Sequence, residues 1–328
     1  MKNVGLVGLG FIGKTHLEAY RNLENCQVTA ICTRNDVAIP SHYNGSFVTN
    51  YEDLLNDKEI DIIDICLPTY LHEEFLIKAS NAGKHIICEK PLTLTLESAN
   101  RMVDAVTKNK VRLFVAHVLR FWPEYKLIKL YSETELKDLE IVHARRLGQA
   151  PAWSCWFQDP QKSGGALFYL HIHDIDFVYY LLGPVDTIYA VGTKNKYGAW
   201  DHVMTNLSFK NKSKAFVEAS QRMPLGYTFT FNFRAQAGTG TVDFTISAGK
   251  NIENIHDSTH QFMYYANQKK SSIEIEKEDA FQNELAYFVN CLETNQENQV
   301  IPLDDVLYTL KLLKAIQQSL ETRKEVRL

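Results

Sequence analysis

Short apolar segments alternate with helix-like segments through the first third of the chain. Buried strands are predicted at residues 4–7, 28–32, 60–66 and 85–88, because each of these runs is short and apolar. The stretches between them have helical character, and the one before residue 85 ends in Ala82-Gly83, a common helix stop. This alternation of strand and helix predicts a parallel, doubly wound sheet.

The pattern changes in the rest of the chain. A helix at 96–108 and a strand at 112–116 are followed by Phe121-Trp122-Pro123, which interrupts the pattern near residue 120. Later runs alternate apolar and polar residues, as antiparallel strands do, at 203–209, 214–220, 228–235, 240–246 and 272–275. Two amphipathic helices at 279–292 and 304–321 follow. The predicted fold class is α/β, with a first domain at 1–120 and an α+β domain with an open, mainly antiparallel sheet at 121–328.

The turn after the first strand reads Gly8-Leu9-Gly10-Phe11-Ile12-Gly13. A strand, these glycines and a helix, in that order, are typical of a dinucleotide-binding Rossmann domain. Gly8 permits the tight turn, Gly10 lets the backbone approach a pyrophosphate, and Gly13 lets the helix pack closely against the strand. The helix N-terminus would offer free N–H groups and a partial positive charge to the phosphates. The alternative is an ordinary glycine-rich turn.

The end of the second strand bears on the choice of cofactor. Thr33 lies 20 residues after Gly13, where an NAD-selective site normally has an acid for the ribose 2′-hydroxyl. A neutral hydroxyl and the guanidinium of Arg34 stand there instead, and Arg34 could pair with a 2′-phosphate or stack on adenine. NADP is therefore slightly favoured over NAD. The alternative is an arginine that points into solvent.

The strand at 85–88 leads into Glu89-Lys90-Pro91. Ligands of open α/β sheets bind at the carboxyl ends of the strands, so Lys90 is placed to move a proton. A lysine partly desolvated beside an apolar strand has a lowered pKa and can exchange protons near neutral pH. Glu89 is interpreted as its orienting neighbour or a structural partner, and the alternative for Lys90 is a surface lysine. His72 is a candidate for contacting the cofactor or capping a helix.

A helix predicted at 166–182 carries the second group of candidates. Its residues 169, 172, 173 and 176 share one face by their spacing. His173 and Asp176 are polar residues of this face. Tyr169 could donate a hydrogen bond, but with an ordinary pKa of about 10 it is no anionic base near pH 7.

Other residues suggest a substrate site. The loop at 150–165 contains Trp153, Trp156 and Phe157, whose planes suit the CH faces of a sugar or cyclic polyol but could equally form a core or subunit contact. His117 and Arg120 follow the strand at 112–116. Arg120 could hold a polar substrate or form a structural ion pair.

Bulk composition narrows the class of protein. With 45% hydrophobic and 23% charged residues the chain is typical of globular proteins, and its net charge of −4 argues against nucleic-acid or membrane-surface partners. No apolar run approaches the ~18 residues of a membrane span. The six cysteines have no metal-binding spacing, which predicts buried reduced thiols, a cytoplasmic protein and no metal site. An HxH metal pair at His171 and His173 is disfavoured, because the two side chains diverge by roughly 200° on a helix.

Several of these motifs together resemble the Gfo/Idh/MocA oxidoreductases, the relatives of glucose–fructose oxidoreductase and inositol dehydrogenase. The matching segments, which spread over the length of the chain, are GLGFIG at 8–13, CLPTYLH at 66–72, AGKHIICEKP at 82–91, HVLRF at 117–121 and GGALFYLHIHDID at 164–176.

The resemblance implies roles for named residues. Lys90 would contact the substrate hydroxyl and the nicotinamide ribose. His173 and Asp176 match the histidine and later aspartate of the last motif, so His173 is the main candidate for a general acid or base, and Asp176 for its orienting residue or a structural hydrogen-bond partner. Tyr169 departs from the aspartate that many relatives have there, and His171 from the usual glycine. The cofactor would contact Gly8, Gly10, Phe11, Ile12, Gly13, Thr33, Arg34, Leu67, Pro68, His72, Glu89 and Lys90. The substrate would contact His117, Arg120, Trp153, Tyr169 and His173.

The function expected is hydride transfer between NADP or NAD and a carbinol or carbonyl carbon of a sugar, polyol or related small molecule. Lys90 and His173, with Tyr169, would handle the hydroxyl proton. A homodimer or homotetramer through the free face of the second sheet is also expected. Two alternatives stay open: a dinucleotide-binding sensor or partner protein without turnover, and an enzyme that retains its cofactor for net non-redox chemistry.

Overall fold

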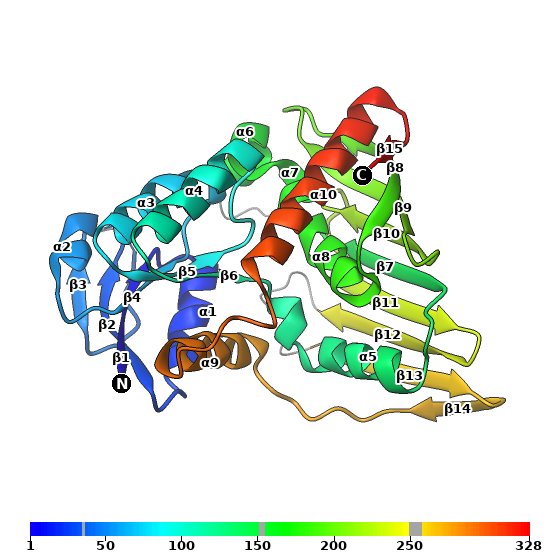
Figure 1. Cartoon of the computed structure of the whole chain (residues 1–328), viewed down its shortest axis with the longest axis horizontal. Coiled ribbons are helices and arrows are strands. Elements are labelled where there is room, and N and C mark those ends of the chain that lie inside the picture. The colour runs from blue at the N-terminus through cyan, green and yellow to red at the C-terminus, as the bar shows by residue number, and fades with distance from the viewer. Residues whose placement is uncertain (35–36, 151–154, 249–257) are drawn as a thin grey trace. The chain divides into compact units, whose positions relative to one another are not determined.

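A computed structural model describes residues 1–34, 37–150, 155–248 and 258–328. The chain divides into two compact units. The first contains Met1–Phe121 and Glu278–Leu307, and the second contains Trp122–Lys277 and Tyr308–Leu328. Each unit has its own sheet and its own helices (Figure 1).

The first unit is built on a parallel six-stranded sheet in the order β3-β2-β1-β4-β5-β6. Its apolar strands are buried, as a sheet covered on both faces requires. The strands are β1 (Lys2–Val7), β2 (Cys26–Cys32), β3 (Ser46–Val48), β4 (Ile62–Ile65), β5 (His85–Glu89) and β6 (Leu113–Ala116). The helices are α1 (Phe11–Tyr20), α2 (Tyr51–Asn56), α3 (His72–Asn81), α4 (Leu96–Lys108) and α9 (Ala280–Glu293). The predicted doubly wound domain is confirmed.

Local capping explains where several of these helices begin. The side chain of Asn50 accepts a hydrogen bond from the N–H of Glu52 at the start of α2. Thr95 caps α4 in the same way through the N–H of Ser98, and Asp279 caps α9. Such side chains satisfy N–H groups that the first helical turn leaves without partners.

The second unit is built on a mixed nine-stranded sheet in the order β14-β13-β12-β11-β7-β10-β9-β8-β15. All neighbours are antiparallel except β7 and β10. The strands are β7 (Ile141–Leu147), β8 (Val185–Lys194), β9 (Trp200–Phe209), β10 (Lys214–Ser220), β11 (Phe229–Ala237), β12 (Gly240–Ala248), β13 (Thr259–Ala266), β14 (Lys269–Ser272) and β15 (Val326–Arg327). The predicted open, mainly antiparallel sheet is confirmed.

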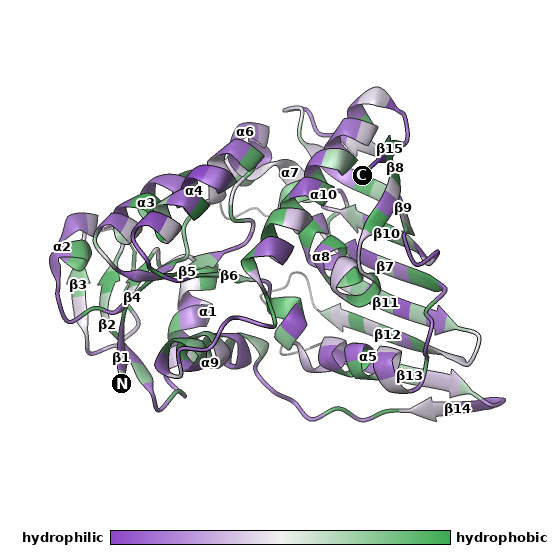
Figure 2. Ribbon diagram, in the orientation of Figure 1, coloured by the Kyte–Doolittle hydropathy of each residue, from purple (hydrophilic) through white to green (hydrophobic). Residues whose placement is uncertain are grey.

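Buried and exposed residues alternate along these strands, and the ribbons change between hydrophobic and hydrophilic colours along their length (Figure 2). Helices pack on one face of this sheet, with α7 over β9, α8 over β7 and β10, and α5 over β12. The helices of the unit are α5 (Pro123–Thr134), α6 (Pro160–Ser163), α7 (Gly165–Tyr169) and α8 (His171–Leu182), and α10 (Leu303–Thr322) begins in the first unit and ends in the second.

Two expectations need correction. The helix predicted at 166–182 is two helices, α7 and α8, which meet at Leu170. The second domain is not continuous to residue 328, because 278–307 belongs to the first unit. In that segment Phe288 of α9 packs against Phe114 and Phe121, at ring distances of 5.0 and 5.9 Å.

The described part of the chain contains no helix long and apolar enough to cross a membrane.

Candidate active site

The carboxyl ends of the parallel strands bring most of the first unit's candidate residues to one edge of the sheet. Gly8 follows β1, Thr33 follows β2, and Lys90 follows β5. Leu67 and Pro68 follow the intervening β4, and His117 follows β6 at the end of the sheet. This edge is where open α/β sheets bind their ligands.

The glycine loop has the geometry of a dinucleotide cradle. Gly8 has φ +93°, and a Cβ there would lie 2.7 Å from the carbonyl oxygen of Cys66. A Cβ on Gly13 would lie 2.0 Å from the carbonyl oxygen of Gly8. Gly10, by contrast, has no atom within 4 Å of such a Cβ, so the space beside it is open. The loop leads into α1, a ten-residue helix whose first N–H groups can face a pyrophosphate.

Thr33 and Arg34 lie at the end of β2, as their sequence positions predicted. The N–H of Thr33 donates to the carbonyl of Val48 over 3.2 Å, and the side chain of Arg34 is exposed. A guanidinium at this surface position is of the right chemistry to pair with an anionic group on a ribose.

Lys90 is half-buried, and its main chain is held by its neighbour. The N–H of Lys90 donates to Oε2 of Glu89 over 3.0 Å. Glu89 itself is only 7% exposed. Burial by itself would raise the pKa of Glu89, but interaction with His16 and the charge of Lys90 outweigh burial and lower it below 4.5. Glu89 is therefore an ionised carboxylate, consistent with an orienting role.

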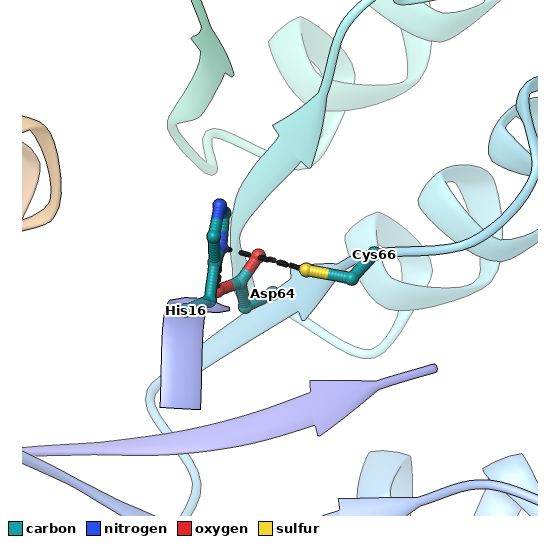
Figure 3. Close-up of side chains that lie close together, drawn as sticks. All are labelled: His16, Asp64 and Cys66. Carbon is teal, nitrogen blue, oxygen red and sulfur yellow. Dashed lines mark hydrogen bonds and ion pairs between the residues drawn. The ribbon is translucent and has the colours of Figure 1, made fainter. Parts of the chain in front are cut away.

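A buried polar cluster that the sequence did not reveal lies behind this turn. Nδ1 of His16 is 2.8 Å from Oδ2 of Asp64 and 3.4 Å from Sγ of Cys66 (Figure 3). The hydroxyl of Tyr20 also donates to Asp64, over 3.0 Å. On its other side, Nε2 of His16 is 3.2 Å from Oε1 of Glu89, an ion-pair contact that lacks the alignment of a hydrogen bond.

The protonation of this cluster follows from its partners. Burial by itself lowers the pKa of His16, but Cys66 and Asp64 outweigh burial and raise the pKa well above 6.5. Burial and the neighbouring carboxylate of Asp64 raise the pKa of the Cys66 thiol, whereas contact with His16 lowers it. The donor atoms of His16, Asp64 and Cys66 all lie within 4.8 Å of one another, a spacing that a metal ion also accepts. Because the three groups already hydrogen-bond to one another, we interpret them as a proton-sharing network.

His72 ties together two loops at the same edge. Its Nε2 is 2.8 Å from the carbonyl oxygen of Leu67, and its Nδ1 is 3.0 Å from that of Pro91. The ring is 1% exposed, and burial lowers its pKa although the neighbouring carbonyls oppose this. The side chain thus supports the turn that carries Lys90. Its contact with a cofactor stays a prediction.

Arg120 is placed as a structural residue. Its side chain is buried, and Nη1 donates over 2.7 Å both to Oδ2 of Asp305 and to the carbonyl of Val300. Arg120 was predicted either to hold a polar substrate or to form a structural ion pair, and it forms the ion pair. A contact of Arg120 with substrate stays a prediction. His117 is also buried, at the start of the turn after β6.

In the second unit, α8 contains both His171 and His173 and places them in different environments. His171 is fully buried and its Nε2 is 2.9 Å from the hydroxyl of Thr205, whereas His173 is partly exposed. Burial lowers the pKa of His171 to about 3, so this ring is neutral. Asp176 is buried and accepts a hydrogen bond from Thr309 over 3.0 Å, which is the structural role weighed for it.

Tyr169 lies at the end of α7 and not in the helix of His173, so the single shared face predicted for the two residues is interrupted at Leu170. Its ring packs against Phe157 at 4.6 Å and Trp156 at 6.1 Å. These aromatics therefore form a packed cluster, one of the roles weighed for them. Trp153 lies outside the described residues.

Comparison with known proteins agrees with this geometry. The profile described as oxidoreductase family, NAD-binding Rossmann fold (GFO_IDH_MocA) matches residues 2–117, and the GFO/IDH/MocA C-terminal domain matches residues 125–241. Together these matches cover more than two thirds of the chain.

Individual relatives extend over nearly the whole length. The uncharacterized oxidoreductase YrbE of Bacillus subtilis is 28% identical, covering 96% of this chain and 93% of that protein. The myo-inositol 2-dehydrogenase of Thermotoga maritima is 26% identical, covering 99% and 98%. A solved levoglucosan dehydrogenase in complex with NADH and levoglucosan has a TM-score of 0.82 at 22% identity, covers 100% of this chain and 99% of that one, and bears on the fold.

The glycine cradle, the lysine at the carboxyl edge of the sheet and the two profile matches lead to one conclusion: the chain belongs to the Gfo/Idh/MocA family and is an NAD(P)-dependent oxidoreductase.

Proposed function

We propose that the protein oxidises or reduces a CH–OH carbon of a sugar, a polyol or a related small molecule, with NADP(H) as the favoured cofactor. The position of Lys90 carries this proposal. It follows β5 at the ligand-binding edge of the sheet, one strand from β4 and two from the strand that leads into the glycine loop. The relatives named as inositol and levoglucosan dehydrogenases support the substrate class.

Different residues of the chain would bind the cofactor and transfer the proton. When bound, the nicotinamide supplies the acceptor or donor of hydride. The main chain at Gly8, Gly10 and Gly13 would hold the pyrophosphate, together with the N-terminus of α1. Nζ of Lys90 would take the hydroxyl proton during oxidation and return it during reduction. The positive charge that Nζ of Lys90 gains with this proton would stabilise a developing alkoxide.

His173 is the proposed second proton-handling residue. It is the partly exposed histidine of α8, whereas His171 is enclosed and neutral. Tyr169 would donate a hydrogen bond to a substrate oxygen. Replacing His173 with Asn should lower kcat by about 10²-fold or more, the usual contribution of a general acid or base.

Lys90→Met tests the proposal directly. Methionine keeps the length of the side chain but has no proton to exchange, so kcat should fall by about 10²–10⁴-fold. The dissociation constant for the dinucleotide, measured by fluorescence titration, should change by less than about threefold, which corresponds to under 1 kcal/mol. Lys78→Met, at an exposed lysine of α3, is the matched control. Full activity of Lys90→Met with the substrates found in a panel of polyols and sugars would refute the mechanism.

The cofactor preference has its own test. If Arg34 pairs with a 2′-phosphate, NADPH should bind more tightly than NADH, and Arg34→Ala should weaken NADPH binding by about tenfold while leaving NADH binding nearly unchanged. Titration of both cofactors into both proteins measures this. Tighter binding of NADH by the unaltered protein would contradict the preference and leave the reaction type in place.

A further inference from the structure

A continuous path of contacts connects the helix of the glycine loop to the turn that carries Lys90. Asp64 contacts Nδ1 of His16 at 2.8 Å, and Nε2 of the same ring is 3.2 Å from Oε1 of Glu89. The second oxygen of Glu89 accepts the main-chain N–H of Lys90 at 3.0 Å. These residues come from α1, β4 and β5, so the path crosses three elements of the first unit.

Each carboxylate oxygen of Glu89 has a different partner. Oε1 faces the imidazole, and Oε2 faces the main chain of Lys90. Because both oxygens are engaged, Glu89 cannot rotate without giving up one of these contacts. A buried carboxylate also needs a compensating charge, and the path provides it through His16.

The charges along the path favour an imidazolium at His16. The groups facing His16 are Asp64 and Cys66 from β4 and the residues after it, and Glu89 from β5. Tyr20 contributes only a hydroxyl to Asp64, and the ring of Phe281 packs 6.0 Å away. A doubly protonated ring presents a positively charged N–H to the carboxylate on each side, whereas a neutral imidazole presents an N–H on one side only.

We propose that His16 is a positioning residue for Lys90: its imidazolium, anchored by Asp64, fixes the carboxylate of Glu89 that holds the main chain of the Lys90 turn. This inference rests on the function proposed above for Lys90. A positioning residue of this kind changes the rate because small displacements of a catalytic group are costly.

Two substitutions at position 16 separate this role from simple support of the fold. In His16→Asn the amide nitrogen takes the place of Nδ1 and keeps the contact with Asp64 but not that with Glu89. In His16→Gln the amide nitrogen takes the place of Nε2 and keeps the contact with Glu89. The two variants remove the same charge from the same buried place, so their difference reports on the Glu89 contact.

The expected kinetic result is a split between the variants. His16→Asn should lower kcat by about 10–10²-fold with little change in dinucleotide affinity, and His16→Gln should keep a kcat at least about tenfold above that of His16→Asn. In a Lys90→Met background, adding His16→Asn should lower the remaining turnover by less than about twofold, because the effect acts through Lys90. Equal kcat values for the two variants, or independent effects in the double variant, would overturn the proposal.

A second readout does not depend on turnover. The charge of Lys90 is one of the causes that lower the pKa of the Glu89 carboxyl, so displacing this carboxylate should change the reactivity of the Lys90 amine. Labelling with an acylating reagent, followed by mass spectrometry, should show Lys90 reacting at least about threefold faster in His16→Asn than in the unaltered protein. Lys78 is the internal reference and should not change. An unchanged labelling rate at Lys90 overturns the proposal. A changed rate in a protein that turns over no substrate refutes only the proposed function.

Discussion

At the scale of single residues, the pairing of His16 with two buried carboxylates decides the protonation of the region behind Lys90. His16, Asp64 and Glu89 are all buried, so the desolvation cost of each charge is offset largely by the neighbouring charges and by the hydrogen bonds from Tyr20 and the main chain of Lys90. An apolar substitute at position 16 would remove the imidazole that contacts Asp64 and would leave Glu89 with the charge of Lys90.

This pairing predicts a dependence of stability on pH. The pKa of His16 is raised in the folded protein, so its stabilising contribution is complete below about pH 6.5, the unfolded value, and is lost as the pH rises through the folded pKa. The melting temperature of the unaltered protein should therefore fall between pH 6 and pH 9. In His16→Asn this fall should be smaller. A pH profile of the variant that parallels that of the unaltered protein would contradict this prediction.

Residues differ in how far the sequence reveals them. Lys90 could be predicted because the strand before it and the turn after it are local patterns, and the sheet then places the residue. His16 could not be predicted, because a histidine on the inner face of a helix has the same local pattern whether it faces apolar atoms or carboxylates. The alternatives for Arg120 were equal in the sequence, since its partner Asp305 is 185 positions away.

At the scale of elements, the loop between β1 and α1 gives the glycines separate roles that can be measured. Gly13→Ala should destabilise the protein by about 1–3 kcal/mol, because its Cβ would lie 2.0 Å from a main-chain oxygen. Gly10→Ala meets no atom within 4 Å and adopts an allowed conformation, so it should cost less than about 1 kcal/mol.

Although Gly10→Ala should change stability little, it should have a large effect on dinucleotide binding. A methyl group at the open position would stand where the pyrophosphate approaches, so Gly10→Ala should weaken binding by about tenfold or more, or 1.4 kcal/mol. Thermal unfolding without cofactor measures the change in stability, and fluorescence titration with the dinucleotide measures the change in its dissociation constant. A Gly10→Ala protein that binds the dinucleotide normally would contradict the cradle assignment.

Strong periodicity made most elements predictable. The helix predicted at 96–108 has the bounds of α4, and the strand predicted at 214–220 has the bounds of β10. The break at Leu170 was not predicted, because the residues around it suit a helix and the interruption depends on packing. The strand β7 was not predicted either, because its place between β11 and β10 arises from pairing with distant strands.

At the scale of the whole molecule, the second sheet has a face that its strand register defines. Val191 pairs with Met204, Met204 with Glu218, and Glu218 with Arg145, so these side chains form a row across β8, β9, β10 and β7. Val191 is 41% exposed, and so is Tyr189 two residues earlier. Assembly of two copies through this face stays a prediction, and a two-fold contact would bring each row against its equivalent.

Charge substitution on this face tests the assembly. Val191→Glu and Met204→Glu should shift the protein toward the monomer in size-exclusion chromatography with light scattering, because buried unpaired carboxylates oppose association. Phe47→Glu, at an exposed residue of β3 in the first unit, is the control. An unaltered protein that is monomeric at micromolar concentration would contradict the prediction.

The place of α9 in the first unit has a consequence for how the protein is made. Phe114 and Phe121 gain Phe288 as a packing partner only after residues 122–277 have left the ribosome. The nucleotide-binding unit therefore remains incomplete during most of translation, and its last helix arrives when the second unit is nearly finished. Until then, Phe114 and Phe121 lack this packing partner on the nascent chain.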